Sequence, residues 1–266
     1  MITIITGDHP RHQFLVKSIA ENNIIDTWII QKRENFQTNS YTENNSLSKL
    51  EKIHFDKRDK AEHDFFSSYK KINQKNIKKI IKIQKEDIEN GNLAKKLKKF
   101  ENINLITYGC QKLGDEILNL FKLNRLNIHG GLSPWYRGSA THFWPSYLLE
   151  PEFTGMTFHH LTQNIDGGDI VHQTVVNLNA KDNLHENACR CVKDFIIELN
   201  LFVEKKVFDE KIIGVKQKTT GRIWTSKMWH PALLEVIYNK FEDKINKFCL
   251  ENKKLRKPKI LSNLSR

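Results

Sequence analysis

The chain has 266 residues, of which 39% are hydrophobic and 28% are charged, and this composition excludes an intrinsically disordered protein. No stretch approaches the roughly 20 apolar residues that a membrane-spanning helix needs. The N-terminus also lacks a basic leader with a cleavage site, so we expect a cytoplasmic protein without a membrane span.

The formal net charge of +12 raises the question of a nucleic-acid partner. The lysines are spread from Lys32 to Lys259 and do not gather on a recognisable nucleic-acid motif, so a solvated surface is the better interpretation. A basic protein still favours an anionic substrate, such as a phosphorylated or nucleotide-linked molecule. Four irregularly spaced cysteines predict no disulfide framework, as in a reducing compartment.

The N-terminal residues predict the opening of an α/β unit. An apolar, β-branched run is followed by a turn, and residues 11–22 have helical spacing. Two interpretations of the turn stay open, because a helix N-terminus can bind an anion or Asp8 can simply cap the helix beside a solvated Arg11. On the first interpretation the substrate-binding candidates are Gly7, Asp8, Arg11 and His12.

Strands and helices then alternate as far as residue 128. Further strands are predicted at residues 26–30, 79–83, 104–107 and 125–128, and helices at residues 47–73, 93–100 and 113–121. This alternation predicts an α/β fold with a Rossmann-like, mostly parallel twisted sheet and flanking helices. Ligands of such sheets bind beyond the carboxyl ends of the strands.

Residues 126–170 contain the groups from which a catalytic site can be built. Asn127 and His129 are two residues apart on a predicted strand, so their side chains share one face. Asp166 lies in a later glycine-rich turn. Taken singly, Asn127 could cap a turn and His129 could be a hydrogen-bonded core residue, but an amide, an imidazole and a carboxylate together favour a site.

Two metal-binding interpretations are weaker. His129, His159 and His160 could form a zinc cluster, but no cysteine or glutamate stands at ligand spacing from them. Cys189 and Cys191 point in different directions on a predicted helix, which is typical of buried apolar residues. We therefore expect no metal.

Several spaced motifs resemble the folate-dependent formyltransferases, which include glycinamide ribonucleotide transformylase, methionyl-tRNA formyltransferase and the sugar N-formyltransferases. The resemblance is firm over about residues 103–178, looser over 1–30 and 77–102, and absent from 33–76, which we interpret as a helical insertion. One departure is Gly130-Gly131 and Ser133, where many members have a Pro/Gly-Ser-Leu-Leu type of run. The motifs are Asn127-Ile128-His129, residues 132–138 (LSPWYRG), residues 154–159 (TGMTFH) and Asp166-Gly167-Gly168-Asp169-Ile170.

The resemblance implies transfer of a formyl group from N10-formyltetrahydrofolate to an amine through a tetrahedral, oxyanionic intermediate. Asn127 would then hydrogen-bond the oxyanion, His129 would exchange protons with the amine, and Asp166 would orient and stabilise the imidazole. It also implies that two loops and His159 bind the folate. The residues are Gly109, Cys110, Gln111, Lys112, Leu113, His159, Thr162, Gln163, Asn164 and Ile165.

The remaining chain is expected to form a C-terminal α+β extension over residues 181–266, after a catalytic domain over residues 1–180. Asp182 is a candidate N-cap for a helix to about residue 205, residues 231–250 predict another helix, and the lysine-rich end from 253 predicts a frayed tail. Arg137 stays open between a substrate clamp and a structural hub for residues 130–140.

By elimination the chain looks most like a sugar N-formyltransferase, whose substrates are amino sugars on nucleoside diphosphates used for surface polysaccharides such as O-antigen. The tail is too short for the tRNA-gripping barrel of methionyl-tRNA formyltransferases, and the turn at residues 7–12 does not resemble the ribonucleotide loop of the purine enzyme. Glycinamide ribonucleotide and methionyl-tRNA remain alternative acceptors. A basic nucleic-acid-binding protein with a degenerate site is a third hypothesis, and related enzymes are often homodimers.

Overall fold

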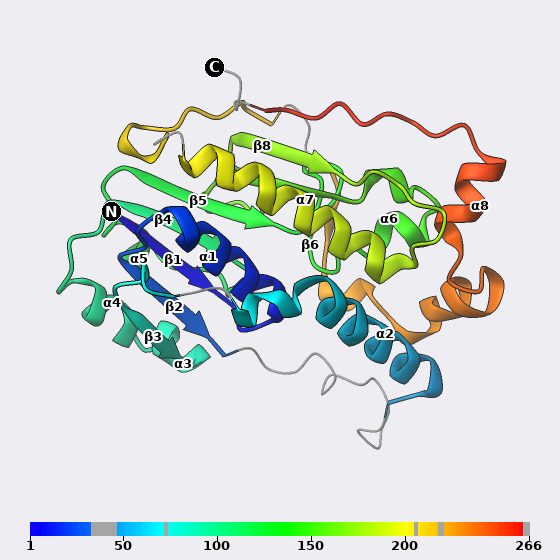
Figure 1. The fold of residues 1–266 in the computed structure, drawn as a ribbon, viewed down its shortest axis with the longest axis horizontal. Coiled ribbons are helices and arrows are strands. Elements are labelled where there is room, and N and C mark those ends of the chain that lie inside the picture. The colour runs from blue at the N-terminus through cyan, green and yellow to red at the C-terminus, as the bar shows by residue number, and fades with distance from the viewer. Residues whose placement is uncertain (33–46, 72–73, 205–206, 218–220, 263–266) are drawn as a thin grey trace.

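A seven-stranded sheet forms the centre of the computed structural model, which describes residues 1–32, 47–71, 74–204, 207–217 and 221–262 (Figure 1). The strand order is β3-β2-β1-β4-β5-β7-β8. β1 to β5 are mutually parallel, β7 is antiparallel to β5, and β8 is antiparallel to β7. The strands are β1 Ile2–Thr6, β2 Thr27–Gln31, β3 Ile80–Ile83, β4 Asn104–Tyr108, β5 Asn124–His129, β7 Gly155–His160 and β8 Ile170–Val175. The predicted mostly parallel, Rossmann-like sheet is confirmed.

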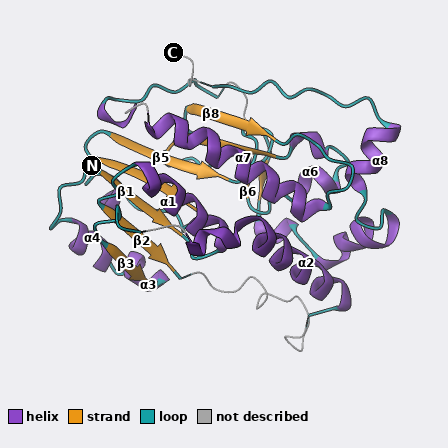
Figure 2. Cartoon of the chain, in the orientation of Figure 1, coloured by secondary structure: helices purple, strands orange, loops and turns teal. Residues whose placement is uncertain are grey.

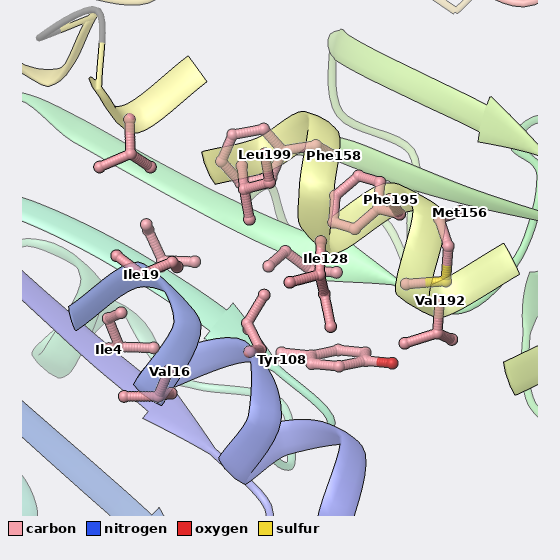
Figure 3. Close-up of a cluster of buried hydrophobic side chains, with 14 of the residues drawn as sticks. Ile4, Val16, Ile19, Tyr108, Ile128, Met156, Phe158, Val192, Phe195 and Leu199 are labelled. Atoms are coloured by element: carbon pink, nitrogen blue, oxygen red, sulfur yellow. The ribbon is translucent and has the colours of Figure 1, made fainter. Parts of the chain in front are cut away.

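Helices cover both faces of this sheet (Figure 2). The long helices α1 (Pro10–Asn22), α2 (Lys49–Phe66) and α7 (Leu184–Glu204) contribute to one apolar core, in which Ile128, Phe158 and Phe195 meet (Figure 3). The short helices α3 (Lys85–Glu89), α4 (Asn92–Leu97) and α5 (Asp115–Leu118) pack on the other face. The helix expected at residues 113–121 is therefore a single turn.

A third apolar cluster joins residues 132–153 to the C-terminal part of the chain. It contains the two-stranded parallel pair β6 (Arg137–Gly138) and β9 (Ile223–Trp224), with α6 (Trp144–Tyr147) and α8 (Ile245–Asn252). Short 3-10 segments lie at Ser67–Lys71, Pro151–Phe153, Val207–Asp209, Ser226–Met228 and Pro231–Leu233, and a π-helical turn lies at Glu235–Lys240.

Two helix predictions were wrong in part, one in the middle of the helix and one at its N-cap. The helix expected over residues 231–250 is broken where Glu242 and Asp243 adopt φ of 50° and 59°, a left-handed conformation that no helix continues through. The Asp243 carboxylate there accepts a hydrogen bond from the Lys57 ammonium at 2.7 Å. The cap of α7 is Asn183, whose Oδ1 accepts from the His185 and Glu186 amides, whereas the expected cap Asp182 pairs with Arg190.

The C-terminal segment is largely exposed but is anchored by individual contacts as far as residue 262, and not frayed as expected. Arg256 pairs with Glu150 at 2.6 Å, and Ser262 bonds the His172 ring on β8 at 2.9 Å. The prediction for residues 263–266, like that for residues 33–46 of the expected insertion, lies outside the described residues. The domain boundary near residue 180 stays a prediction, and α7 packs in the same core as α1 and the sheet.

Gly109→Ala is expected to lower the free energy of unfolding by about 2–5 kcal/mol. Gly109 has φ of 64°, and an added Cβ would lie 2.4 Å from Nε2 of the buried His12 ring, so backbone strain and overpacking add. Urea denaturation measures the change. Gly91 is the matched control, because its φ is 73° but nothing lies within 4 Å of its Cβ position. Gly91→Ala should cost about 1–2 kcal/mol, and equal losses for the two variants would contradict the packing argument.

Candidate active site

A cavity of about 770 Å³ lies beyond the carboxyl ends of β1, β4 and β5. It is bounded by the segments that follow these strands, by the loop between β7 and β8, and by parts of α2 and α7. Most of the residues singled out in the sequence meet here. Those that line it are His12, Gly109, Cys110, Gln111, Lys112, Leu113, Asn127, His129, His159, Thr162, Gln163, Asn164, Ile165, Asp166 and Arg11.

A row of three side chains crosses the sheet at the floor of this cavity. Thr107 is opposite Asn127 in the parallel β4–β5 ladder, and Asn127 is opposite His159 in the antiparallel β5–β7 ladder. Thr107 Oγ1 donates to Asn127 Oδ1 at 2.7 Å, and Asn127 Nδ2 lies 3.1 Å from His159 Nε2. His159 Nδ1 is 2.8 Å from the carbonyl oxygen of His160 and donates to it, and His159 Nε2 also lies 3.5 Å from Asp166 Oδ1. The Asn127 amide is thereby fixed with its N–H groups toward the site.

The His129 ring is held by a hydrogen bond to the backbone of Tyr136. Its Nε2 lies 2.8 Å from the Tyr136 carbonyl oxygen, which can only accept, so Nε2 carries a proton. Nδ1 then faces the Asp166 Oδ2 atom at 3.4 Å. The atom of His129 that can take up a further proton is therefore Nδ1, and doing so would complete an ion pair with Asp166.

Asp166 lies in a turn outside the strands, and hydrogen bonds to its carboxylate and to its backbone fix its position. It has φ of 45°, a left-handed conformation that aspartate tolerates better than most residues. Its Oδ2 accepts from the Gly138 amide at 2.9 Å, and its backbone oxygen accepts from Gln217 Nε2 at 2.9 Å. The same Gln217 nitrogen donates to the Gly168 oxygen at 2.8 Å, so one side chain fixes both sides of the turn.

At neutral pH, His129 favours its uncharged form and Asp166 favours its ionised form. Burial lowers the pKa of His129 below 6.5, although the Asp166 carboxylate opposes this change. Burial raises the pKa of Asp166, but the charges and hydrogen bonds of His129, His159 and the Gly138 amide outweigh it and bring that pKa to about 2. At neutral pH the site thus contains a neutral imidazole beside an ionised carboxylate. This pair can accept a proton from an amine.

The profile of the formyl transferase family matches residues 55–195, which is more than half of the chain and includes Asn127, His129 and Asp166. The chain belongs to the formyl transferase family. Relatives agree at lower coverage. The chain is 34% identical over 134 residues to the bifunctional polymyxin resistance protein ArnA of Wigglesworthia glossinidia brevipalpis, covering 48% of this chain and 20% of that protein. It is 28% identical over 155 residues to a methionyl-tRNA formyltransferase of Buchnera aphidicola, covering 57% of this chain and 48% of that protein.

The fold extends the likeness over more of the chain. The N-formyltransferase from Helicobacter canadensis in complex with folinic acid and dTDP-3-aminofucose superposes with a TM-score of 0.53 at 17% identity. The match covers 86% of this chain and 73% of that one. This likeness concerns the fold, and the chain spans half or less of the length of the curated relatives it matches.

The two segments expected to bind folate in this family lie side by side on one wall of the cavity. Lys112 Nζ donates to the Gln163 carbonyl oxygen at 3.1 Å, and Gln163 Nε2 donates to Asp115 Oδ1 at 2.5 Å. Cys110 is half-buried, and Ile165 is 51% exposed at the rim. The structure brings these segments together, and their roles in binding stay predictions.

The expected substrate-binding residues are divided. Arg11 and His12 line the cavity, but the Arg11 guanidinium is paired with Glu62 of α2, whose side chain is 4% exposed. Gly7 and Asp8 are not among the described lining residues. Asp8 is not the cap of α1 either, because His9 occupies the N-cap position. The predicted solvated Arg11 is therefore also wrong.

Arg137 lies on β6 and is not among the described residues that line the cavity. Its side chain is turned toward the Gly167 backbone, and the residue is 9% exposed. Its buried Nε has no hydrogen-bond partner in the described part of the chain. The choice between a clamp and a structural hub stays open.

Sequence reasoning missed Thr107 and Gln217. Thr107 could have been found by aligning the carboxyl ends of the predicted parallel strands, because it ends the strand beside Asn127. Gln217 gave no signal, since it lies 51 residues beyond Asp166 in an irregular segment. Within the described ranges no group of three or more potential ligands is placed to hold a metal ion, and no helix is long and apolar enough to span a bilayer.

Thr107→Val should lower kcat for formyl transfer by about 3–10-fold, because the variant keeps the side-chain shape but loses the hydrogen bond that orients the Asn127 amide. Steady-state kinetics measure the effect. Thr107→Ser is the control, since it keeps the hydroxyl and should keep most of the rate. A valine variant as fast as wild type would show that Asn127 does not need this bond.

The acid limb of kcat/KM should have an apparent pKa below 6.5, because His129 must be neutral to accept a proton and burial lowers its pKa. Asp166→Asn removes the charge that opposes this lowering, so the limb should move to lower pH while the rate falls. The pH–rate profiles of wild type and variant provide the measurement. A limb that stays in place or moves to higher pH would contradict the pairing of the two groups.

Proposed function

We propose that the protein transfers the formyl group of N10-formyltetrahydrofolate to the amine of a nucleotide-linked amino sugar. The observation that carries this proposal is the convergence of Asn127, His129 and Asp166 on one cavity, with the protonation states that amine acylation needs. Family membership supports the reaction type, and the arrangement of charges supports the class of substrate.

The folate would supply an activated formyl group, and the chain's own residues would handle charge and protons. Asn127 Nδ2 lies 3.1 Å from His159 Nε2 and donates to Asp166 Oδ1 at 3.5 Å, and an oxygen that gains negative charge would replace the longer of these two partners. His129 Nδ1 would accept the proton that the attacking amine loses and would return it to the folate nitrogen when the bond between that nitrogen and the formyl carbon breaks. Asp166 would stabilise the resulting imidazolium at 3.4 Å.

The wall next to the catalytic cluster has the composition that a folate ring needs. Leu113, Leu118 and Leu161 line it with apolar surface, and the backbone of the two neighbouring segments provides hydrogen-bonding groups. A flat heteroaromatic ring with polar edges fits such a lining. This supports the predicted folate-binding role of residues 109–113 and 162–165.

The charges of the cavity favour anionic substrates. Among the described lining residues Arg11, Arg58 and Lys112 are cationic, and Asp166 is the one carboxylate. Both N10-formyltetrahydrofolate and a nucleoside diphosphate sugar carry negative charge, so both agree with this excess. The Helicobacter protein, with folinic acid and dTDP-3-aminofucose, supports the sugar proposal by its fold.

A second acceptor, methionyl-tRNA, is favoured by the curated relatives that bear this activity in their name. The same catalytic cluster would serve it. The cytoplasmic location and the homodimer expected from the sequence stay predictions.

The acceptor is identified by incubating the protein with N10-formyltetrahydrofolate and a panel of nucleotide amino sugars, glycinamide ribonucleotide and methionyl-tRNA. We expect a formyl mass gain on a nucleotide amino sugar by mass spectrometry. His129→Ala should slow this transfer by about 10²–10⁴-fold through loss of the proton acceptor. His160→Ala is the matched control. His160 follows the site residue His159 on β7, but it is not among the described residues that line the cavity.

Formylation of methionyl-tRNA alone would replace the sugar proposal with the second acceptor. Transfer by His129→Ala at the wild-type rate would overturn the catalytic assignment. Salt-sensitive nucleic-acid binding with no formyl transfer to any acceptor would instead support the nucleic-acid hypothesis.

A further inference from the structure

Helix α2 forms part of the cavity wall, although it begins in the segment where the sequence showed no resemblance to any formyltransferase motif. Its His54, Phe55 and Arg58 line the cavity together with His185 of α7 and Trp229, and we call these five residues the α2 wall. They contact one another. The His54 ring lies 4.4 Å from His185 and 6.0 Å from Trp229, and the Arg58 guanidinium lies 4.9 Å from the Phe55 ring centroid.

The three cations of the cavity differ in how firmly they are neutralised. Arg11 is paired with the buried Glu62, so its charge is already compensated at low dielectric. Lys112 donates to Gln163 between the segments expected to bind folate.

Of the two arginines, Arg58 has the weaker compensation. Its carboxylate partner among the described residues is Asp59, the next residue along the chain, at 2.8 Å and with a side chain that is 56% exposed. Exposed pairs of this kind contribute about 0–1 kcal/mol, so an anionic ligand can displace Asp59 at little cost.

The histidines around Arg58 have lowered pKa values. Burial and, as a smaller cause, the positive charge of Arg58 together lower the pKa of His54 to about 3. Burial is also the main cause of the lowered pKa values of His185 and His9, and Arg58 again contributes to both. At neutral pH the histidines of the α2 wall are therefore uncharged hydrogen-bonding groups beside one guanidinium.

We propose that Arg58 binds the phosphate groups of the acceptor substrate, and that Trp229, His54 and His185 contact the uncharged part next to them. The inference rests on the proposed function for the identity of the acceptor and extends it to the residues that select it. A guanidinium forms two parallel hydrogen bonds to phosphate oxygens, which fixes orientation as well as charge. The half-buried Trp229 offers a flat apolar surface to a ring beside the phosphates.

This assignment gives α2 a role in acceptor selection and transfers the predicted anion site from Arg11 to Arg58. Arg11 and Arg58 differ in the burial of the carboxylate that each one pairs with. Arg11 belongs to a buried pair that joins α1 to α2, whereas Arg58 is free to exchange its exposed partner for a ligand.

The test is the binding of UDP and dTDP by isothermal titration calorimetry, with folinic acid as a second ligand. Arg58→Gln should weaken binding of the diphosphate that wild type binds by about 10–100-fold, because a charge-assisted hydrogen bond is lost. Arg58→Lys should be intermediate, since it keeps the charge but not the paired geometry. The affinity for folinic acid should change less than about 2-fold in both, because Arg58 is not on the folate-side wall.

Lys60→Gln is the matched control. It removes one positive charge from the same helix, but Lys60 is 75% exposed, pairs with Asp64 and is not among the described lining residues. It should leave diphosphate binding within about 2-fold of wild type. Urea denaturation of every variant checks that the fold is retained.

Equal diphosphate affinities for Arg58→Gln and wild type would overturn the inference, as would a wild type that binds neither UDP nor dTDP. An equal loss in Lys60→Gln would also overturn it, because the effect would then be one of net charge. Failure of the proposed function is distinguishable, since it would appear as the absence of formyl transfer to nucleotide sugars in the acceptor panel. Loss of diphosphate binding in Arg58→Gln would still support the site in that case.

Discussion

The hydrogen-bonded row of Thr107, Asn127 and His159 is the interaction on which the rest of the site depends. It exists because the register of two different ladders, one parallel and one antiparallel, places these residues side by side. A slip of β5 by one residue would turn Asn127 into the core and Ile128 into the cavity. Ile128 instead packs against Phe158 among the buried side chains of the opposite face (Figure 3). The apolar core that stabilises the fold therefore also fixes the orientation of the polar residues.

Asp166 shows how burial and pairing compete. An ionised carboxylate in a largely buried position is costly unless nearby charges and hydrogen bonds compensate it. Here the Gly138 amide and two imidazoles compensate it so well that the pKa falls to about 2. The Gly138 amide is available because β6 pairs with β9, and Gln217 holds the backbone of the turn. Both supports involve the chain beyond residue 195, outside the matched family segment, so the C-terminal part contributes to the geometry of the Asp166 carboxylate.

The sequence was sufficient where local rules decide the structure. Strand periodicity placed Asn127 and His129 on one face, and the glycine-rich motifs identified Asp166, so the catalytic cluster and the sheet could be anticipated. The sequence was insufficient where the position of a residue depends on a partner that is distant in the chain. Nothing near Arg11 shows that Glu62 neutralises it, and nothing near residues 231–250 shows that Asp243 turns away to bind Lys57. The helix prediction at 231–250 relied on apolar spacing, and two left-handed residues overrode it.

The central claim is that His129 is a neutral base whose Nε2 is protonated and whose Nδ1 faces Asp166. The most direct measurement is the ¹⁵N NMR spectrum of the histidine side chains at neutral pH, with His129 assigned by its loss in His129→Gln. The account predicts a neutral ring with a protonated Nε2 and an unprotonated Nδ1. A ring protonated on both nitrogens, or a neutral ring with the proton on Nδ1, would contradict it.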